Sequence, residues 1–128
     1  MVGGIIGNAE FENNGYVQNC YNAGSVTLAS GGAGPAGGVI GGFSESTSKL
    51  IIESNFYLNG TATLGIGGTV PSGVTEPTTF ENNQTSLGGL RDALNNWLTK
   101  DNNKNNPGNI YKSWIIKEGG DGYPEFAE

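Results

Sequence analysis

The chain repeats a short glycine-rich hydrophobic motif, and this repeat constrains the fold more than any other feature. Gly-Gly-Ile-Ile-Gly at residues 3–7 returns as Gly-Gly-Val-Ile-Gly at residues 37–41, thirty-four residues later, and a weaker copy follows at residues 66–70. A period in the thirties is typical of proteins that stack one small structural unit on the next. The sequence therefore predicts stacked repeats.

A second repeated stretch follows each of the first two copies of the motif. Asn-Cys-Tyr-Asn-Ala-Gly at residues 19–24 lies behind the first copy, and Asn-Phe-Tyr-Leu-Asn-Gly at residues 55–60 lies behind the second. Aligning the first Asn of each stretch gives an offset of thirty-six residues, two more than at the glycine pairs. This alignment predicts three pairs of neighbours: Asn19 with Asn55, Cys20 with Phe56 and Tyr21 with Tyr57.

The segments between the turn residues are short and rich in β-branched and aromatic side chains. Residues 49–58 alternate with period two, which places Leu50, Ile52, Ser54, Phe56 and Leu58 on one face of a single predicted strand. Such a unit buries its apolar side only when each strand pairs with its equivalent about 4.8 Å away. The predicted fold is mainly β, a glycine-rich β-solenoid. A β-sandwich with coincidental glycine pairs is the alternative.

The last third of the chain changes to a helical period. Within residues 86–99 one helical face carries four leucines and a tryptophan, and Ser86 is the expected N-cap. We predict two β repeats at 1–64, an irregular transition at 65–85, and a C-terminal α/β cap at 86–128 that covers the open end of the stack. Because residue 1 falls inside a repeat, we also expect preceding repeats in a longer protein, or edge-to-edge self-association.

Charge and composition exclude several classes of function. The net charge is −6 and the six basic residues are scattered, which argues against nucleic acid and anionic membranes as partners. The chain has no histidine, so zinc sites that use histidine and Ser-His-Asp or Cys-His nucleophiles are excluded. Cys20 is the only cysteine, so no internal disulfide forms. No membrane-spanning apolar stretch is present in the sequence.

The segment Val-Gln-Asn-Cys-Tyr-Asn-Ala-Gly-Ser-Val at residues 17–26, after the motif at residues 3–7, resembles the GLUG-motif repeat. The resemblance covers residues 2–64, and the second copy departs from it, with Phe56 in place of the Cys. It implies a secreted or cell-surface bacterial protein, such as an adhesin-like protein or the non-catalytic region of an IgA1-specific metallopeptidase. It implies no catalytic residues, because the motif positions are structural.

Other candidate sites have simpler structural interpretations. Tyr16, Tyr21 and Tyr57 are candidates for an aromatic strip that stacks on sugars, although packing between repeats is the favoured interpretation. The acidic pairs Glu10 with Glu12 and Glu45 with Glu53 suggest glycoside hydrolysis only weakly. Residues 101–106 resemble a calcium loop but lack its glycine at position 6 and its glutamate at position 12. We therefore predict no catalytic, cofactor or metal residues.

These observations give two function hypotheses and a weaker third. The chain is expected to be a non-catalytic, adhesin-like repeat region at the bacterial cell surface or outside the cell, where it binds a host glycan or an extracellular protein. The alternative is a purely structural spacer or capping module beside a peptidase-like catalytic domain or an anchoring domain. An enzyme is the weakest hypothesis, because no set of converging groups is apparent in the sequence.

Overall fold

A computed structural model of the chain describes residues 1–10, 15–44, 50–100 and 111–128. The chain divides into two compact units, Met1–Thr79 and Phe80–Glu128. Each unit has its own packed side chains and is described separately below.

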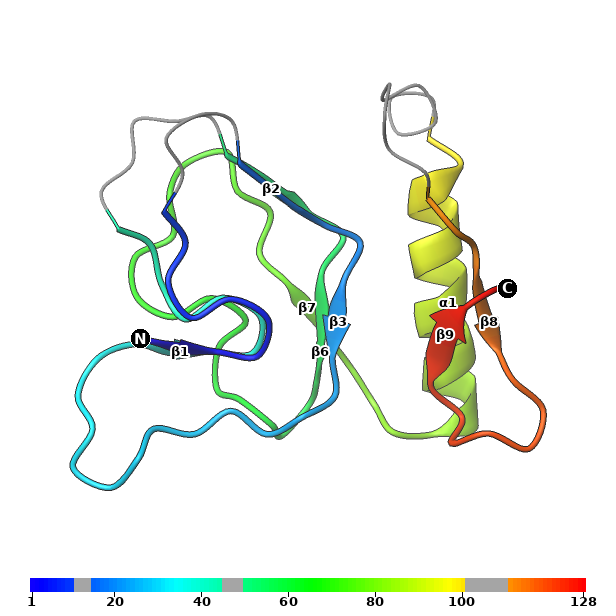
Figure 1. The fold of residues 1–128 in the computed structure, drawn as a ribbon, viewed down its shortest axis with the longest axis horizontal. Helices are drawn as coiled ribbons and strands as arrows, with labels where there is room; N and C mark the ends of the chain where they lie inside the picture. Colours follow the sequence, from blue (N-terminus) through cyan, green and yellow to red (C-terminus); the bar gives the residue numbers. More distant parts are fainter. Residues whose placement is uncertain (11–14, 45–49, 101–110) are drawn as a thin grey trace. The chain divides into compact units, whose positions relative to one another are not determined.

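In the first unit, successive passes of the chain run in the same direction side by side (Figure 1). We call residues 2–26 the first pass, residues 36–61 the second pass and residues 64–79 the third pass. The strands of the first two passes pair in parallel: β1 (Val2–Gly3) with β4 (Ala36–Gly37), β2 (Gly15–Gln18) with β5 (Leu50–Glu53), and β3 (Tyr21–Asn22) with β6 (Phe56–Leu58).

The third pass lies beside the second. Ile66 forms an isolated parallel bridge with Ile40, and the N–H of Thr75 donates to the carbonyl of Ile52 at 2.9 Å. Farther along, β7 (Thr78–Phe80) lies next to β6. These contacts fall inside the stretch that the sequence predicts to be an irregular transition.

The predicted β-solenoid is wrong. The strands of the described residues are two to four residues long and form separate sheets of two or three strands, with no closed sheet and no solenoid sheet. One cause is a pair of corners at Asn19 (φ 57°) and Ser54 (φ 55°), where left-handed backbone interrupts the strands. Repetition in the sequence therefore produces local parallel pairing, and the corners prevent long strands from forming.

The predicted register of the polar stretch is also wrong, by one residue. In the structure Tyr21 pairs with Phe56, and Asn22 pairs with Tyr57, an offset of thirty-five. The offset is thirty-four at Ala9 and its partner Phe43, so the extra residue enters between there and the start of β2. The sequence alignment matched Asn with Asn, whereas the structure matches the two left-handed corners, Asn19 and Ser54.

The corner at Ser54 also divides the predicted single strand at residues 49–58 into β5 and β6. Before the corner Ile52 is buried, as the alternation predicts. After the corner the buried residues are Asn55 and Tyr57, while Phe56 is only half-buried. A left-handed residue adds a turn to the chain, so the period-two pattern does not continue through it.

The core of the first unit is built from the glycine motifs and the strand that follows each of them. Its buried side chains come from all the passes and meet in one cluster: Ala9, Val17, Val39, Ile40, Ile52, Tyr57 and Ile66. Apolar burial at about 25 cal/mol per Å² is the main favourable term for such a small unit. Parallel pairing aligns the repeated motifs so that their apolar residues share this cluster.

In its described residues, the second unit contains one helix and an antiparallel pair of strands. Helix α1 (Gln84–Leu98) buries the predicted face through Leu87, Leu90, Leu94 and Trp97. Strands β8 (Trp114–Ile116) and β9 (Pro124–Phe126) pair antiparallel. The predicted N-cap is wrong, because the side chain of Asn83, not Ser86, accepts the hydrogen bond that begins the helix.

Candidate functional site

The two left-handed corners of the first unit lie side by side and share a polar network. Its centre is Asn55, which is only 2% exposed. The Nδ2 of Asn55 donates to the carbonyl of Val17 at 2.7 Å, and its Oδ1 accepts from the N–H of Cys20 at 3.2 Å. The carbonyl of Asn55 accepts from the N–H of Thr78 at 3.0 Å. One buried residue thus connects the first, second and third passes.

Further hydrogen bonds between side chains join the first and second passes at the same corners. The Oγ of Ser54 donates to the Oδ1 of Asn19 at 3.1 Å, and the Nε2 of Gln18 donates to the Oε1 of Glu53 at 3.0 Å. The backbone follows this pairing, because the N–H of Asn19 donates to the carbonyl of Glu53 at 3.2 Å. Glu53, one of the acidic candidates from the sequence, therefore accepts hydrogen bonds from the neighbouring pass.

Cys20 lies in the first of these corners and is half-buried. Burial raises the pKa of its thiol, and this effect outweighs the opposing one of a backbone hydrogen bond at Gln18. The Sγ donates to the carbonyl of Gln18 at 3.1 Å, a contact that only the protonated thiol can make. Because the thiolate is the reactive form of cysteine, a raised pKa keeps this thiol protonated and unreactive at neutral pH. This environment suits a small packing residue better than a nucleophile.

Asn22 joins the polar stretch of the first pass to the glycine motif of the second. Its Nδ2 donates to the carbonyl of Gly38 at 2.9 Å and to the carbonyl of Gly24 at 2.9 Å. Its Oδ1 accepts from the N–H of Gly24, also at 2.9 Å. The Asn of the Cys-Tyr-Asn segment is thus occupied by backbone groups of the repeat itself.

The three candidate tyrosines do not lie in one row. Tyr16 on β2 is 52% exposed and pairs with Ile51, and Tyr21 is half-buried beside Phe56. Tyr57 is only 8% exposed, and its ring lies against Gly38 so closely that a Cβ there would be 2.6 Å from the ring. The structure therefore leaves Tyr16 as the most accessible of the three.

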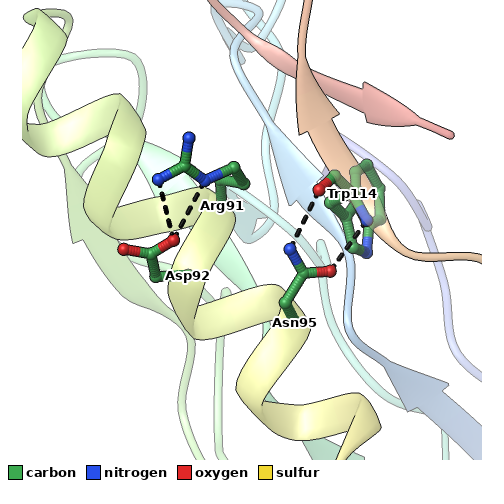
Figure 2. A network of polar contacts seen from close by, with 4 residues as sticks. All are labelled: Arg91, Asp92, Asn95 and Trp114. Carbon is green, nitrogen blue, oxygen red and sulfur yellow. Dashed lines mark hydrogen bonds and ion pairs between the residues drawn. The ribbon is translucent and has the colours of Figure 1, made fainter.

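In the second unit, an amide holds the helix and the strand pair together, as Figure 2 shows. The Nδ2 of Asn95 donates to the carbonyl of Trp114 at 2.9 Å, and the N–H of Trp114 donates to the Oδ1 of Asn95 at 2.8 Å. One turn earlier on the helix, Arg91 forms an exposed ion pair with Asp92 at 2.9 Å. The paired amide contact orders the start of β8, and the exposed ion pair adds little to stability.

The aromatic side chains of the second unit pack against one another. The rings of Trp97 and Tyr111 meet edge to face with their centroids 5.3 Å apart. The ring centroids of Trp114 and Phe126 are 4.3 Å apart. Trp97 is buried on α1, whereas Trp114 is half-buried.

The remaining acidic candidates are dispersed or fall outside the described residues. Glu10 is exposed, while Glu12, Glu45 and the loop at residues 101–106 lie outside the described residues. Two further acidic residues are engaged within the second unit: Asp121 accepts from the N–H of Tyr123 at 3.0 Å, and the Oε1 of Glu125 lies 3.8 Å from the Nζ of Lys117. Across residues 1–10, 15–44, 50–100 and 111–128, no group of three His, Cys, Asp or Glu residues is placed to hold a metal ion.

The structure shows a network that sequence reasoning missed. Asn55 was expected to lie beside Asn19 on an equivalent position, whereas it reaches across to Val17 and Cys20. In the sequence Asn55 follows the polar residues Glu53 and Ser54, and nothing in this pattern points to the network. No helix in the described part of the chain is long and apolar enough to cross a membrane. Comparisons with protein-family models, with curated proteins and with solved structures found no match to this chain.

Proposed function

We propose that this chain is a non-catalytic structural module, built from repeats, of a secreted or cell-surface bacterial protein. The observation that carries the proposal is the network at the paired corners. There the polar side chains of the repeated segment bond to the backbone and side chains of the neighbouring passes. Groups that serve as internal connections are not available to bind a ligand. The extracellular location rests on the resemblance of residues 2–64 to the GLUG-motif repeat.

Close backbone packing at the glycine motifs supports the same role. A Cβ at Gly37 would lie 2.0 Å from the carbonyl oxygen of Ile40, and one at Gly38 would meet the ring of Tyr57. Glycine permits the backbone to approach its neighbours at these positions. The motif residues thus contribute to packing between passes, which is the requirement of a spacer or scaffold.

A second candidate function is adhesin-like binding of a host glycan or an extracellular protein. The specific observation in its favour is Tyr16, which is 52% exposed on β2. An exposed aromatic ring on a strand offers a stacking surface for a sugar or an apolar side chain. Tyr57, which the sequence placed in the same strip, is largely buried and contributes little to such a surface.

The test is binding of the full chain, displayed multivalently, to an array of glycans and extracellular-matrix proteins. Multivalent display makes weak single contacts measurable. The amide NMR spectrum first shows that the displayed chain is folded. The structural proposal predicts that this folded chain shows no selective, saturable binding. The control variant is Leu64→Ala, at another exposed position. Selective binding that is lost in Tyr16→Ala and kept in Leu64→Ala contradicts the structural role and supports the adhesin-like one.

A further inference from the structure

The hydrogen bonds between passes have a repeating direction. The N–H groups of Gly4 and Ile5 donate to the carbonyls of Gly37 and Val39 in the second pass, at 3.2 and 3.0 Å. In turn, the N–H of Gly38 donates to the carbonyl of Leu64 in the third pass, at 2.7 Å. The first and second passes are offset by thirty-four residues here, so Gly3 and Ile5 of the first pass correspond to Gly37 and Val39 of the second. The equivalent carbonyls in the first pass are therefore those of Gly3 and Ile5. In a parallel arrangement these carbonyls face away from the second pass.

Burial at equivalent positions differs in a consistent way. Val39 is fully buried, whereas its equivalent Ile5 is 41% exposed. Gly41 is buried and its equivalent Gly7 is exposed. The second pass is covered on both sides, by the first and third passes. Among the described residues, the pairings of residues 2–7 are with the second pass alone. We call the uncovered side of residues 2–7 the first-pass face.

The last glycine of the motif provides a second, independent observation. A Cβ at Gly41 would lie 2.3 Å from the carbonyl oxygen of Gly7, and a Cβ at Gly67 would lie 2.3 Å from the carbonyl oxygen of Gly41. The same close approach therefore occurs between the first and second passes and between the second and third. At Gly7 the nearest atom to such a Cβ is the carbonyl oxygen of Met1, at 3.6 Å, an ordinary contact.

We infer that the first-pass face binds a polypeptide segment with the same Gly-Gly-hydrophobic-hydrophobic-Gly pattern, running parallel to residues 2–7. The N–H groups of that segment donate to the carbonyls of Gly3 and Ile5, as Gly4 and Ile5 donate to the second pass. Its last carbonyl lies over the Cα of Gly7, where only glycine leaves room. The inference deepens the proposed structural role, on which it rests, by naming the partner of the module.

The backbone pattern selects this occupant over others. The contact repeats an interface that the molecule already forms twice, including the glycine notch at Gly41 and Gly67. Parallel strand addition of this kind uses main-chain hydrogen bonds for affinity and alternate side chains for specificity. A glycan has no matching row of N–H groups and gains nothing from the absence of a Cβ at Gly7.

The test adds a synthetic peptide of residues 1–28 to the full chain and follows the backbone amides by NMR. In the existing interfaces the N–H of Gly41 donates to the carbonyl of Ile6, and the N–H of Gly67 donates to that of Ile40. Binding therefore predicts saturable shifts at Gly7 and at least tenfold slower hydrogen exchange of its amide. A hydrogen-bonded amide exchanges only when the structure opens.

Gly7→Ala is the discriminating variant, because it alters the proposed contact and no close contact within the chain. We expect it to reduce peptide affinity at least tenfold while the melting temperature stays unchanged. The matched control is Gly89→Ala on an exposed position of α1 with open space around it, which retains peptide binding. Equal affinity of the Gly7→Ala and unmodified chains would overturn the inference.

A covalently linked copy covers the case in which the free peptide binds too weakly to detect, since ordering a flexible peptide reduces affinity. For this, residues 1–35 are duplicated ahead of residue 1, which raises the effective concentration. Unchanged exchange at Gly7 in both forms would contradict the inference. So would shifts at Gly7 that depend on the concentration of the chain and that the peptide does not compete with, because another surface of a second copy would then be the occupant. Neither result bears on ligand binding in the array, so the two proposals fail separately.

Discussion

At the scale of single residues, Asn55 is the best example of how a repeat positions a polar group. It is buried, and its amide pairs with one donor and one acceptor of the first pass, on the two sides of the corner at Asn19. Buried backbone groups are nearly always paired, so a side chain must supply the partner at such corners. Asn has both a donor and an acceptor, which makes it suited to this position.

We predict that Asn55→Ala lowers the free energy of unfolding by about 1–3 kcal/mol. The substitution leaves the carbonyl of Val17 and the N–H of Cys20 without their side-chain partner in a buried site. Urea denaturation measures the change. The control is Asn8→Ala, which removes an exposed hydrogen bond to Ser44 and should shift stability by less than about 0.5 kcal/mol. Equal effects of the two substitutions would contradict the structural role of Asn55.

The raised pKa of Cys20 predicts a pH dependence of stability. The folded chain holds this thiol proton at pH values where the unfolded chain has lost it. The stabilising contribution is therefore complete below the unfolded-state pKa of about 8.5 and is lost as the pH rises through the higher folded-state pKa. Unfolding free energies at pH 7 and pH 9.5 should differ more for the unmodified chain than for Cys20→Ala. An identical difference would show that Cys20 is not linked to folding.

At the scale of elements, helix α1 was predicted closely and the strands were not. The helical face of Leu87, Leu90, Leu94 and Trp97 follows from a period that depends only on the helix itself. The helix ends one residue earlier than predicted and begins two residues earlier, because Asn83 accepts from the N–H of Ser86 at 2.8 Å. The hydroxyl of Ser86 accepts instead from the N–H of Glu81 at 2.8 Å.

The strands depend on features that sequence patterns do not carry. The alternation at residues 49–58 continues through Ser54, but its positive φ divides the strand and changes which side chains are buried afterwards. Similarly, the match of Asn19 to Asn55 was chemical, whereas the structural equivalence is between backbone corners. In this register Tyr57 pairs with Asn22 and is buried, whereas Tyr16 is exposed.

The N-cap assignment leads to a prediction for α1. Asn83→Ala should destabilise the second unit by about 1 kcal/mol, because it removes the acceptor for an N–H group at the start of the helix. Asn82→Ala, at an exposed position outside the helix, is the control. The measurement is thermal unfolding followed by helical circular dichroism. If Ser86→Ala were as harmful as Asn83→Ala, the hydrogen bond of Ser86 to Glu81 would matter as much as the cap.

At the scale of the whole molecule, each unit relies on its own core. Leu94 is fully buried on α1 of the second unit, and Ile40 is fully buried in the cluster of the first unit. Leu94→Ala should cost about 2–5 kcal/mol, the range for large-to-small changes in a core. Amide exchange should increase on α1 more than on β5 and β6. Uniform acceleration throughout the chain would contradict the division into two units.

The central claim is that the repeated segments pair in parallel with an offset of thirty-five through the corners. The most direct measurement is the scalar coupling across backbone hydrogen bonds in a labelled sample of the full chain. The structure predicts couplings from the N–H of Phe56 to the carbonyl of Cys20 and from the N–H of Thr78 to the carbonyl of Asn55. Coupling of the N–H of Tyr57 to the carbonyl of Cys20 would restore the offset of thirty-six and contradict this account.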